Sequence, residues 1–208
     1  MNPSPLRVAA VIFPGFEVLD FFGPVELLSL PANAFSINTV AEREGAVQSA
    51  QGPRVMAERA LSQSADYDLV LVPGGVGTRT EVANPVLLEW LRQAERSARF
   101  VASVCTGSAL LARAGLLDGR RATSNKIAFD WVASQGSAVR WERRARWVED
   151  GKFFTSSGVS AGMDMTLGLI AHILGRGAAD DAARRAEYLW HDDAASDPFA
   201  AATGPQPS

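Results

Sequence analysis

The chain has 208 residues and a formal net charge of −3, and 47% of its residues are hydrophobic, which is enough for one α/β domain with a large buried core. A chain with this negative net charge lacks the broad positive surface field that attracts nucleic acid. The single cysteine excludes an internal disulfide and fits a reducing cytoplasm, and no apolar stretch approaches the roughly 20 residues that cross a bilayer.

Apolar runs bounded by glycine, proline or charged residues predict the strands of a central sheet. In chain order these runs are residues 7–13, 35–41, 68–72, 100–104, 120–123, 144–149 and 152–155. Residues 42–58 alternate charged and small side chains around two glycines, which predicts a short hairpin or an edge. Asp150-Gly151, between the last two runs, is a strong two-residue hairpin signal.

Helical spacing of apolar residues predicts a helix after most of these strands. The predicted helices cover residues 19–28, 85–94, 108–114, 127–133, 161–174 and 179–190. Because strands and helices alternate throughout, we expect residues 1–208 to form one flavodoxin-like, three-layer α/β/α sandwich with a mainly parallel sheet. The Ala-, Pro- and Ser-rich stretch from residue 194 to 208 is expected to be a loose tail.

Cys105 lies at the joint between the strand that ends at Val104 and the helix that begins at Ser108. A tight strand-to-helix turn lifts a side chain clear of the sheet and points the free N–H groups of the helix at it. These N–H groups favour a thiolate, so the turn predicts a nucleophile whose pKa lies below that of a free thiol. The alternative is a buried structural cysteine.

Asp20 and Glu17 lie one helical turn apart near the carboxyl end of the first strand, where open α/β sheets place their ligand sites. Asp20 is the candidate acid, with helix capping as the alternative, and Glu17 is expected to be solvated. The loop at 73–77 lacks both the Lys-Ser/Thr of a phosphate-binding loop and the third glycine of a dinucleotide fingerprint. Its glycines, Gly74 and Gly75, allow close approach of a backbone N–H to a ligand, with an ordinary tight turn as the alternative.

Two further groups of residues argue against other functions. His172 lies within an apolar helical pattern and His191 follows Trp190 near the end of the chain, so both are too isolated for a metal site. Residues 140–147 interleave arginine with tryptophan, but a twisted exposed strand explains this pattern better than a nucleic-acid interface in an acidic chain.

Three separated motifs carry a family resemblance. They are Leu-Asp-Phe-Phe-Gly-Pro at 19–24, Val-Pro-Gly-Gly-Val-Gly at 72–77 and Ser-Val-Cys-Thr-Gly-Ser at 103–108. Together they resemble the DJ-1/PfpI superfamily and, within it, the isonitrile hydratases, over nearly the whole chain. The resemblance implies that Cys105 is the nucleophile, that Asp20 is the catalytic acid, and that the amides of Gly75 and Thr106 form an anion or oxyanion hole.

The resemblance also implies the reaction: cysteine-dependent hydration of an isonitrile to an N-substituted formamide, with no cofactor or metal. It implies a cytoplasmic homodimer with a small-molecule substrate and with neither nucleic acid nor membrane as a partner. The dimer patch on the first helix is expected to include Phe21, Phe22 and Leu27. The alternatives are a DJ-1-like glyoxalase or deglycase acting on methylglyoxal, and a non-catalytic sensor or binding domain based on the cysteine.

Two positions near the motifs qualify this interpretation. Thr106 follows the cysteine where the peptidase-like branch has a histidine base, so protease and glutaminase functions are disfavoured. Asn125 stands where many relatives, including the hydratases, carry a histidine. Asparagine forms hydrogen bonds but does not exchange protons near neutral pH, so Asn125 either orients the substrate or indicates different chemistry.

Overall fold

The computed structural model describes residues 4–63 and 66–200. A seven-stranded sheet lies at its centre, with the strand order β10-β11-β7-β6-β1-β2-β5. These strands are β1 (Leu6–Val11), β2 (Phe35–Ala41), β5 (Arg59–Ala60), β6 (Leu69–Val72), β7 (Phe100–Ser103), β10 (Trp147–Asp150) and β11 (Phe153–Ser156). Within this sheet, every pairing of the described strands is parallel except β10–β11, so the predicted mainly parallel sheet is confirmed.

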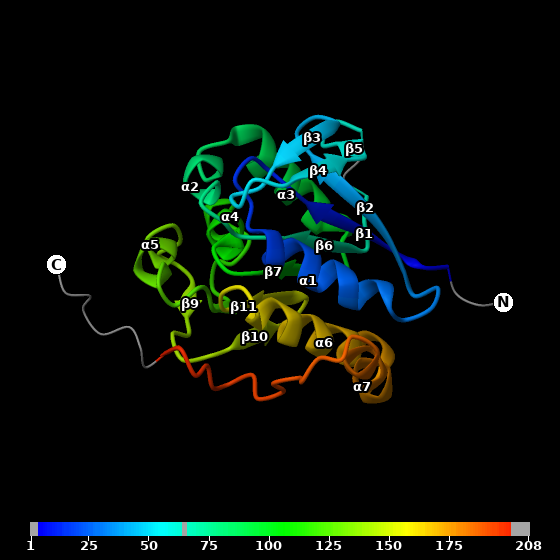
Figure 1. Cartoon of the computed structure of the whole chain (residues 1–208). Helices are drawn as coiled ribbons and strands as arrows, with labels where there is room; N and C mark the ends of the chain where they lie inside the picture. The colour runs from blue at the N-terminus through cyan, green and yellow to red at the C-terminus, as the bar shows by residue number, and fades with distance from the viewer. Residues whose placement is uncertain (1–3, 64–65, 201–208) are drawn as a thin grey trace.

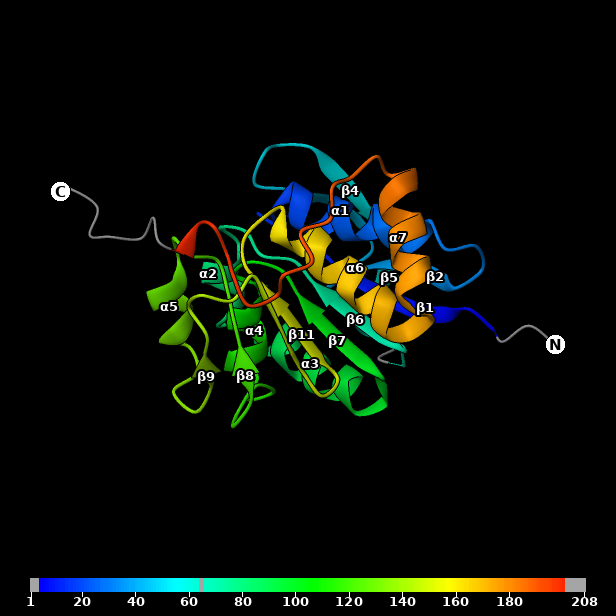
Figure 2. The same cartoon turned by 90° about the horizontal axis from the view of Figure 1, so that it is seen from below.

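Helices cover both faces of this sheet and give the predicted three-layer sandwich (Figure 1). One face carries α1 (Val18–Ser29), α6 (Ala161–Leu174) and α7 (Arg176–Arg185), and the other carries α3 (Pro85–Ser97) and α4 (Gly107–Arg113), as Figure 2 shows from below. The short helices α2 (Thr78–Glu81) and α5 (Phe129–Ala133) flank α4. Within the described ranges, no helix has the length and apolar character needed to cross a membrane.

The middle strands are buried on both sides because helices cover both faces of the sheet. Every residue of β6 and of β7 is buried. These two strands run parallel to each other, with Val72 opposite Ser103, and β6 also pairs in parallel with β1. The turns that follow β1, β6 and β7 therefore meet at one edge of the sheet, where this class of fold binds ligands.

Two small sheets flank the central one. β3 (Gly45–Gln48) and β4 (Arg54–Ala57) form an antiparallel hairpin, which confirms the prediction for residues 42–58. β8 (Arg121–Ala122) and β9 (Arg140–Trp141) pair in parallel, so the expected strand near residue 120 is short and lies outside the main sheet.

The last helix begins and ends earlier than predicted. It was expected over residues 179–190, but α7 spans Arg176–Arg185. Glu187 adopts a positive φ of 49°, and the N–H of Tyr188 donates to the Ala183 carbonyl at 2.9 Å. The left-handed Glu187 and the hydrogen bond from the Tyr188 N–H form a Schellman motif. This motif ends the helix, although a glycine usually occupies the left-handed position.

The segment from residue 194 to 200 is held against the body of the protein. The Arg146 N–H donates to the Ala194 carbonyl at 2.8 Å, and the Asp197 N–H donates to the Arg144 carbonyl at 2.8 Å. The Asp197 side chain is fully buried. The expectation of a loose tail is therefore not met over these residues, and positions 201–208 lie outside the described residues.

The arginines between residues 140 and 147 do not form a free basic patch. Arg143 pairs with Asp130, and the guanidinium of Arg146 is buried and donates to Asp164 at 2.7 Å. Protein carboxylates neutralise the charges of these two arginines.

Candidate active site

Cys105 occupies the turn between β7 and α4, as the sequence predicts. Its backbone is left-handed, with φ of 56°, which is uncommon for a residue with a side chain and is maintained only where neighbouring contacts enforce it. The Cys105 N–H donates to the Ser157 carbonyl at 3.1 Å. The Cys105 carbonyl accepts from the hydroxyls of Ser124 at 2.8 Å and Ser108 at 3.1 Å. These bonds fix the turn and leave the residue only 7% exposed.

Asp20 is the third residue of α1 and is completely buried. Its Oδ2 accepts a hydrogen bond from the Gly74 N–H at 2.9 Å. Its Oδ1 has no hydrogen-bond partner among the residues that the structure describes. The first turn of α1 has no side-chain cap, so the capping alternative for Asp20 is excluded. The carboxylate instead reaches out of the helix to the glycine loop and the cysteine.

The Asp20 carboxyl and the Cys105 thiol compete for one negative charge. Burial raises the pKa of Asp20 to about 7, the charge of Glu17 adds to this rise, and the Gly74 N–H and the Cys105 thiol oppose it. Burial and then the charge of Asp20 raise the pKa of Cys105, while the Thr106 N–H and the Asn125 side chain lower it by less. The predicted lowered thiol pKa is wrong, because burial beside a carboxylate outweighs the helix N-terminus. Above about pH 7, the pair holds one proton.

The glycine loop after β6 packs directly on Thr106. A Cβ atom at Gly74 would lie 2.6 Å from the Thr106 nitrogen and 2.8 Å from Asp20 Oδ2, so no side chain fits there. The Gly75 N–H donates to the Thr106 hydroxyl at 3.0 Å, and the Thr78 hydroxyl donates to the same oxygen at 3.1 Å. The Gly75 and Thr106 amides of the predicted oxyanion hole are therefore close together. However, the Gly75 N–H already donates its hydrogen bond to the Thr106 hydroxyl.

Asn125 lies on the other side of the sulfur. Its Oδ1 accepts from the Ala128 N–H at 2.9 Å, which leaves Nδ2 as the donor that acts on the Cys105 thiol. Gly158 packs against the same Nδ2, and a Cβ atom there would clash with it. At the position where relatives have histidine, this chain thus presents a fixed hydrogen-bond donor with no proton to exchange.

The fold thus brings together all six residues that the sequence nominates, which are Cys105, Asp20, Thr106, Gly74, Gly75 and Asn125. Sequence reasoning missed Thr78, Ser124 and Val159. The Val159 N–H acts on the Asp20 carboxylate, and Val159 has a positive φ of 52°, which is an outlier for a β-branched residue. No sequence pattern marks these three positions, because each contributes through a contact that forms only in the folded chain. Glu17 is half-buried and bonded to Gln51, so it is less solvated than expected.

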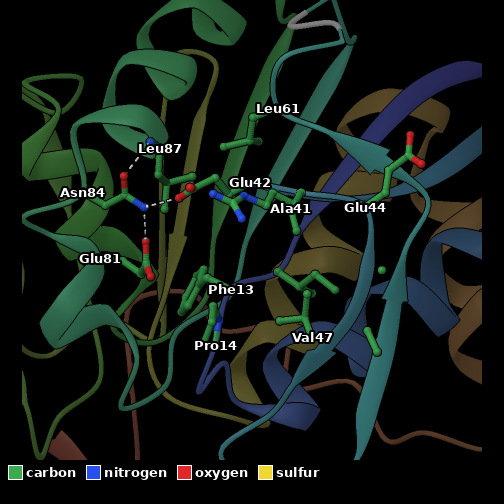
Figure 3. A pocket seen from close by; sticks show the side chains of 14 residues that line it. Phe13, Pro14, Ala41, Glu42, Glu44, Val47, Leu61, Glu81, Asn84 and Leu87 are labelled. Carbon is green, nitrogen blue, oxygen red and sulfur yellow. Dashed lines mark hydrogen bonds between the residues drawn. The ribbon is translucent and has the colours of Figure 1, made fainter.

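A separate cavity of about 320 Å³ lies beside the carboxyl ends of β1 and β2 (Figure 3). Phe13, Val47 and Leu61 contribute to its apolar lining, which does not include Cys105. Three carboxylates line it, those of Glu42, Glu44 and Glu81, and the first and last accept from the Asn84 side chain at 3.0 and 2.8 Å.

Comparison with known proteins places this geometry in a family. Residues 6–172 match the model of the DJ-1/PfpI family, so the chain belongs to it. Among its relatives, isonitrile hydratase of Pseudomonas putida is 32% identical over 184 residues, which are 88% of this chain and 78% of that protein. The HTH-type transcriptional regulator CdhR of Pseudomonas aeruginosa is 35% identical over 170 residues, which are 79% of this chain but half of the regulator.

Solved structures agree with the fold. A THiJ/PfpI family protein from Pseudomonas syringae superposes with a TM-score of 0.82 at 30% identity, over 89% of this chain and 76% of that one. DJ-1beta of Drosophila melanogaster superposes with a TM-score of 0.79 at 20% identity, over 90% of this chain and all of that one, and so shares the architecture. The flavodoxin-like sandwich predicted from the sequence is confirmed.

Proposed function

We propose that this protein is a cysteine-dependent lyase that hydrates an isonitrile to an N-substituted formamide. The observation that carries the proposal is a completely buried carboxyl group, Asp20, whose pKa of about 7 suits proton transfer, paired with the cysteine of a strained turn. The similarity to isonitrile hydratase of Pseudomonas putida supports the choice of substrate.

The first half of the reaction forms a carbon–sulfur bond. Above about pH 7, Asp20 is ionised and the Cys105 thiol holds the proton that the pair shares. As the sulfur attacks the terminal isonitrile carbon, Asp20 accepts the thiol proton. The electron pair left on that carbon then takes the proton from Asp20, which gives a neutral thioimidate on Cys105 and restores the carboxylate.

The second half consumes one water molecule. Water adds to the thioimidate carbon, and Asp20 accepts one of its protons and delivers it to the nitrogen. The carbon–sulfur bond then breaks as the carbonyl forms, and Asp20 transfers the hydroxyl proton back to the departing sulfur. No electron is lost or gained, so the chemistry needs no redox group. The Thr106 N–H and the Asn125 side chain stabilise negative charge on the sulfur in both halves.

We also propose that the protein acts as a cytoplasmic homodimer with a small-molecule substrate. Of the three residues expected at the dimer patch, Phe21 and Leu27 are buried in the core, which corrects that part of the expectation. Phe22 is 43% exposed on α1, and Leu19, one turn away, is 38% exposed. These two side chains are the ones available to a second copy.

The experiment that tests the function is product analysis after incubation with cyclohexyl isocyanide and, separately, with methylglyoxal. The account predicts N-cyclohexylformamide from the wild type and none from Cys105→Ala. Lactate from methylglyoxal without any formamide would favour the glyoxalase alternative. Turnover of neither compound would favour the sensor.

A further inference from the structure

One arginine stands next to the candidate active site without belonging to the proton-transfer machinery. Arg79 lies on α2, directly after Thr78, whose hydroxyl bonds Thr106 beside the nucleophile. The Arg79 guanidinium carbon lies 3.4 Å from the centre of the Trp131 ring on α5. Since α2 and α5 both pack beside α4, the helix that begins two residues after Cys105, the pair bridges the two short helices that flank it (Figure 1). The stacking holds the guanidinium flat and restricts its rotation.

The charge of Arg79 is not neutralised by the protein. Four other arginines lie over aromatic rings, and three of them also pair with a carboxylate: Arg120 with Asp150, Arg143 with Asp130 and Arg176 with Asp180. The fourth, Arg99 over Phe100, has no ion pair among the described residues. Across residues 4–63 and 66–200, no carboxylate lies within ion-pair distance of Arg79, and no hydrogen bond of its guanidinium is found. Burial lowers the pKa of Arg79, and negative charge that forms on Cys105 acts in the opposite direction.

Two exposed apolar residues lie close in sequence to residues of the candidate site. Val76, three residues before Arg79, is 69% exposed, and Ile127, two residues after Asn125, is 85% exposed. Large side chains this exposed are available for an apolar ligand. The unpaired cation Arg79 and these two apolar residues are thus each within two residues of a member of the candidate site: Thr78, Gly75 and Asn125.

The geometry points to Arg79 as the group that binds an anionic end of the substrate, so that the substrate class is isonitriles that carry a carboxylate. This inference rests on the proposed function for the isonitrile part alone. A guanidinium presents paired N–H donors that match the two oxygens of a carboxylate, and stacking on Trp131 reduces the entropy lost when it binds one. Arg79 is a specificity residue in this account, because the bonds that form and break lie at Cys105.

The first test does not depend on isonitrile turnover. Iodoacetate and iodoacetamide alkylate the same thiol, but only iodoacetate is an anion. The alkylation rate with iodoacetate divided by the rate with iodoacetamide therefore does not depend on how much thiolate is present. We expect the ratio for Cys105 to exceed that for free cysteine, and to fall about ten-fold in Arg79→Gln, with Arg79→Lys in between. The preference should also weaken with added salt.

The matched control for this test is Arg99→Gln. Arg99 also lies near an aromatic ring, that of Phe100, but at the opposite end of β7 from Cys105, and its loss changes the net charge equally. Its ratio should stay within about two-fold of the wild type. An unchanged ratio in Arg79→Gln, an equal fall in Arg99→Gln, or a thiol inert to both reagents would overturn the inference.

The second test compares isocyanoacetate with its neutral methyl ester as substrates. The wild type should prefer the acid, and Arg79→Gln should lose about ten-fold in kcat/KM on the acid while the ester changes less than about two-fold. Equal losses on both compounds would contradict a role for Arg79 in binding the anion. If the wild type hydrates neither compound, the proposed function fails, and the alkylation ratio still decides whether Arg79 recruits anions to Cys105.

Discussion

Asp20 is placed in the fold at a cost in stability. Its carboxyl is completely buried, and burial raises its pKa to about 7 although the Gly74 and Val159 N–H groups and the Cys105 thiol oppose the rise. In the unfolded chain the same group has a pKa near 3.9. Between these two values the folded protein binds the proton and the unfolded chain does not, so the stability contributed by Asp20 falls as the pH rises.

We therefore expect Asp20→Asn to be more stable than the wild type at neutral and alkaline pH. Asparagine can still accept from the Gly74 N–H but carries no charge to bury. The increase in the free energy of unfolding should be small near pH 4 and grow as the pH rises toward 7. Above about pH 7 it should reach a limit of about 4 kcal/mol. Urea unfolding at several pH values measures it. A variant less stable than the wild type at about pH 8 would contradict the assigned electrostatics.

Glu17 adjusts the pKa of Asp20 from one turn away. Its negative charge is one of the causes that raise the pKa of Asp20, and removing it in Glu17→Gln should lower that pKa. Because the reaction requires ionised Asp20, the acidic limb of kcat/KM against pH should move to lower pH, with little change in the plateau. The control is Glu26→Gln, on the exposed face of the same helix, which should leave the limb in place. Identical profiles for all three proteins would contradict the coupling.

At the scale of elements, the segment of residues 194–200 supports the loop that carries Asn125. Lys126, the next residue, is almost fully buried, and its Nζ donates to the Thr123 hydroxyl at 2.9 Å and the Ala145 carbonyl at 2.6 Å. Asp197 lies 3.9 Å from that Nζ and 3.7 Å from Arg146. It provides a buried negative charge beside two buried cations.

Asp197→Asn should therefore destabilise the protein by about 3 kcal/mol near neutral pH, the loss typical of an uncompensated buried charge. Burial lowers the pKa of Lys126 to about 8, and Asp197 opposes this. As the pH rises through about 8, Lys126 loses its charge and the difference from the wild type should shrink. Asp193→Asn, at an exposed position immediately before this segment, is the matched control for urea unfolding. Equal free energies of unfolding for Asp197→Asn and Asp193→Asn would show that the Asp197 charge does not stabilise the fold.

The sequence predicts features that depend on a local pattern, and it does not predict features that depend on contacts formed only in the folded chain. Buried apolar runs such as residues 69–72 and 100–103 reveal strands, because their pattern is local. The fixed position of residues 194–200 has no such pattern, since it depends on Asp197 meeting Lys126 and Arg146 in the folded state. The residues of the candidate site were predictable from motifs, but the direction of the thiol pKa was not, because it depends on burial and on Asp20 rather than on the turn alone.

At the scale of the whole molecule, we expect a dimer that uses the exposed face of α1. A stable two-fold interface buries more than about 1,000 Å², and exposed Phe22 and Leu19 are suited to its centre. Sedimentation at micromolar concentration should show a dimer for the wild type and a monomer for Phe22→Glu. A wild type that sediments only as a 22.2 kDa monomer would contradict this assembly.

The central claim is that Asp20 moves the proton while Cys105 attacks the isonitrile carbon. The most direct test is the initial rate of N-cyclohexylformamide formation against pH for the wild type and Asp20→Asn. The account predicts a wild-type rate that rises through about pH 7, as Asp20 becomes able to accept the thiol proton. It predicts a rate at least about 100-fold lower in Asp20→Asn, the smaller end of what a lost acid–base group costs. Near-normal hydration by Asp20→Asn, or no formamide from the wild type, would contradict it.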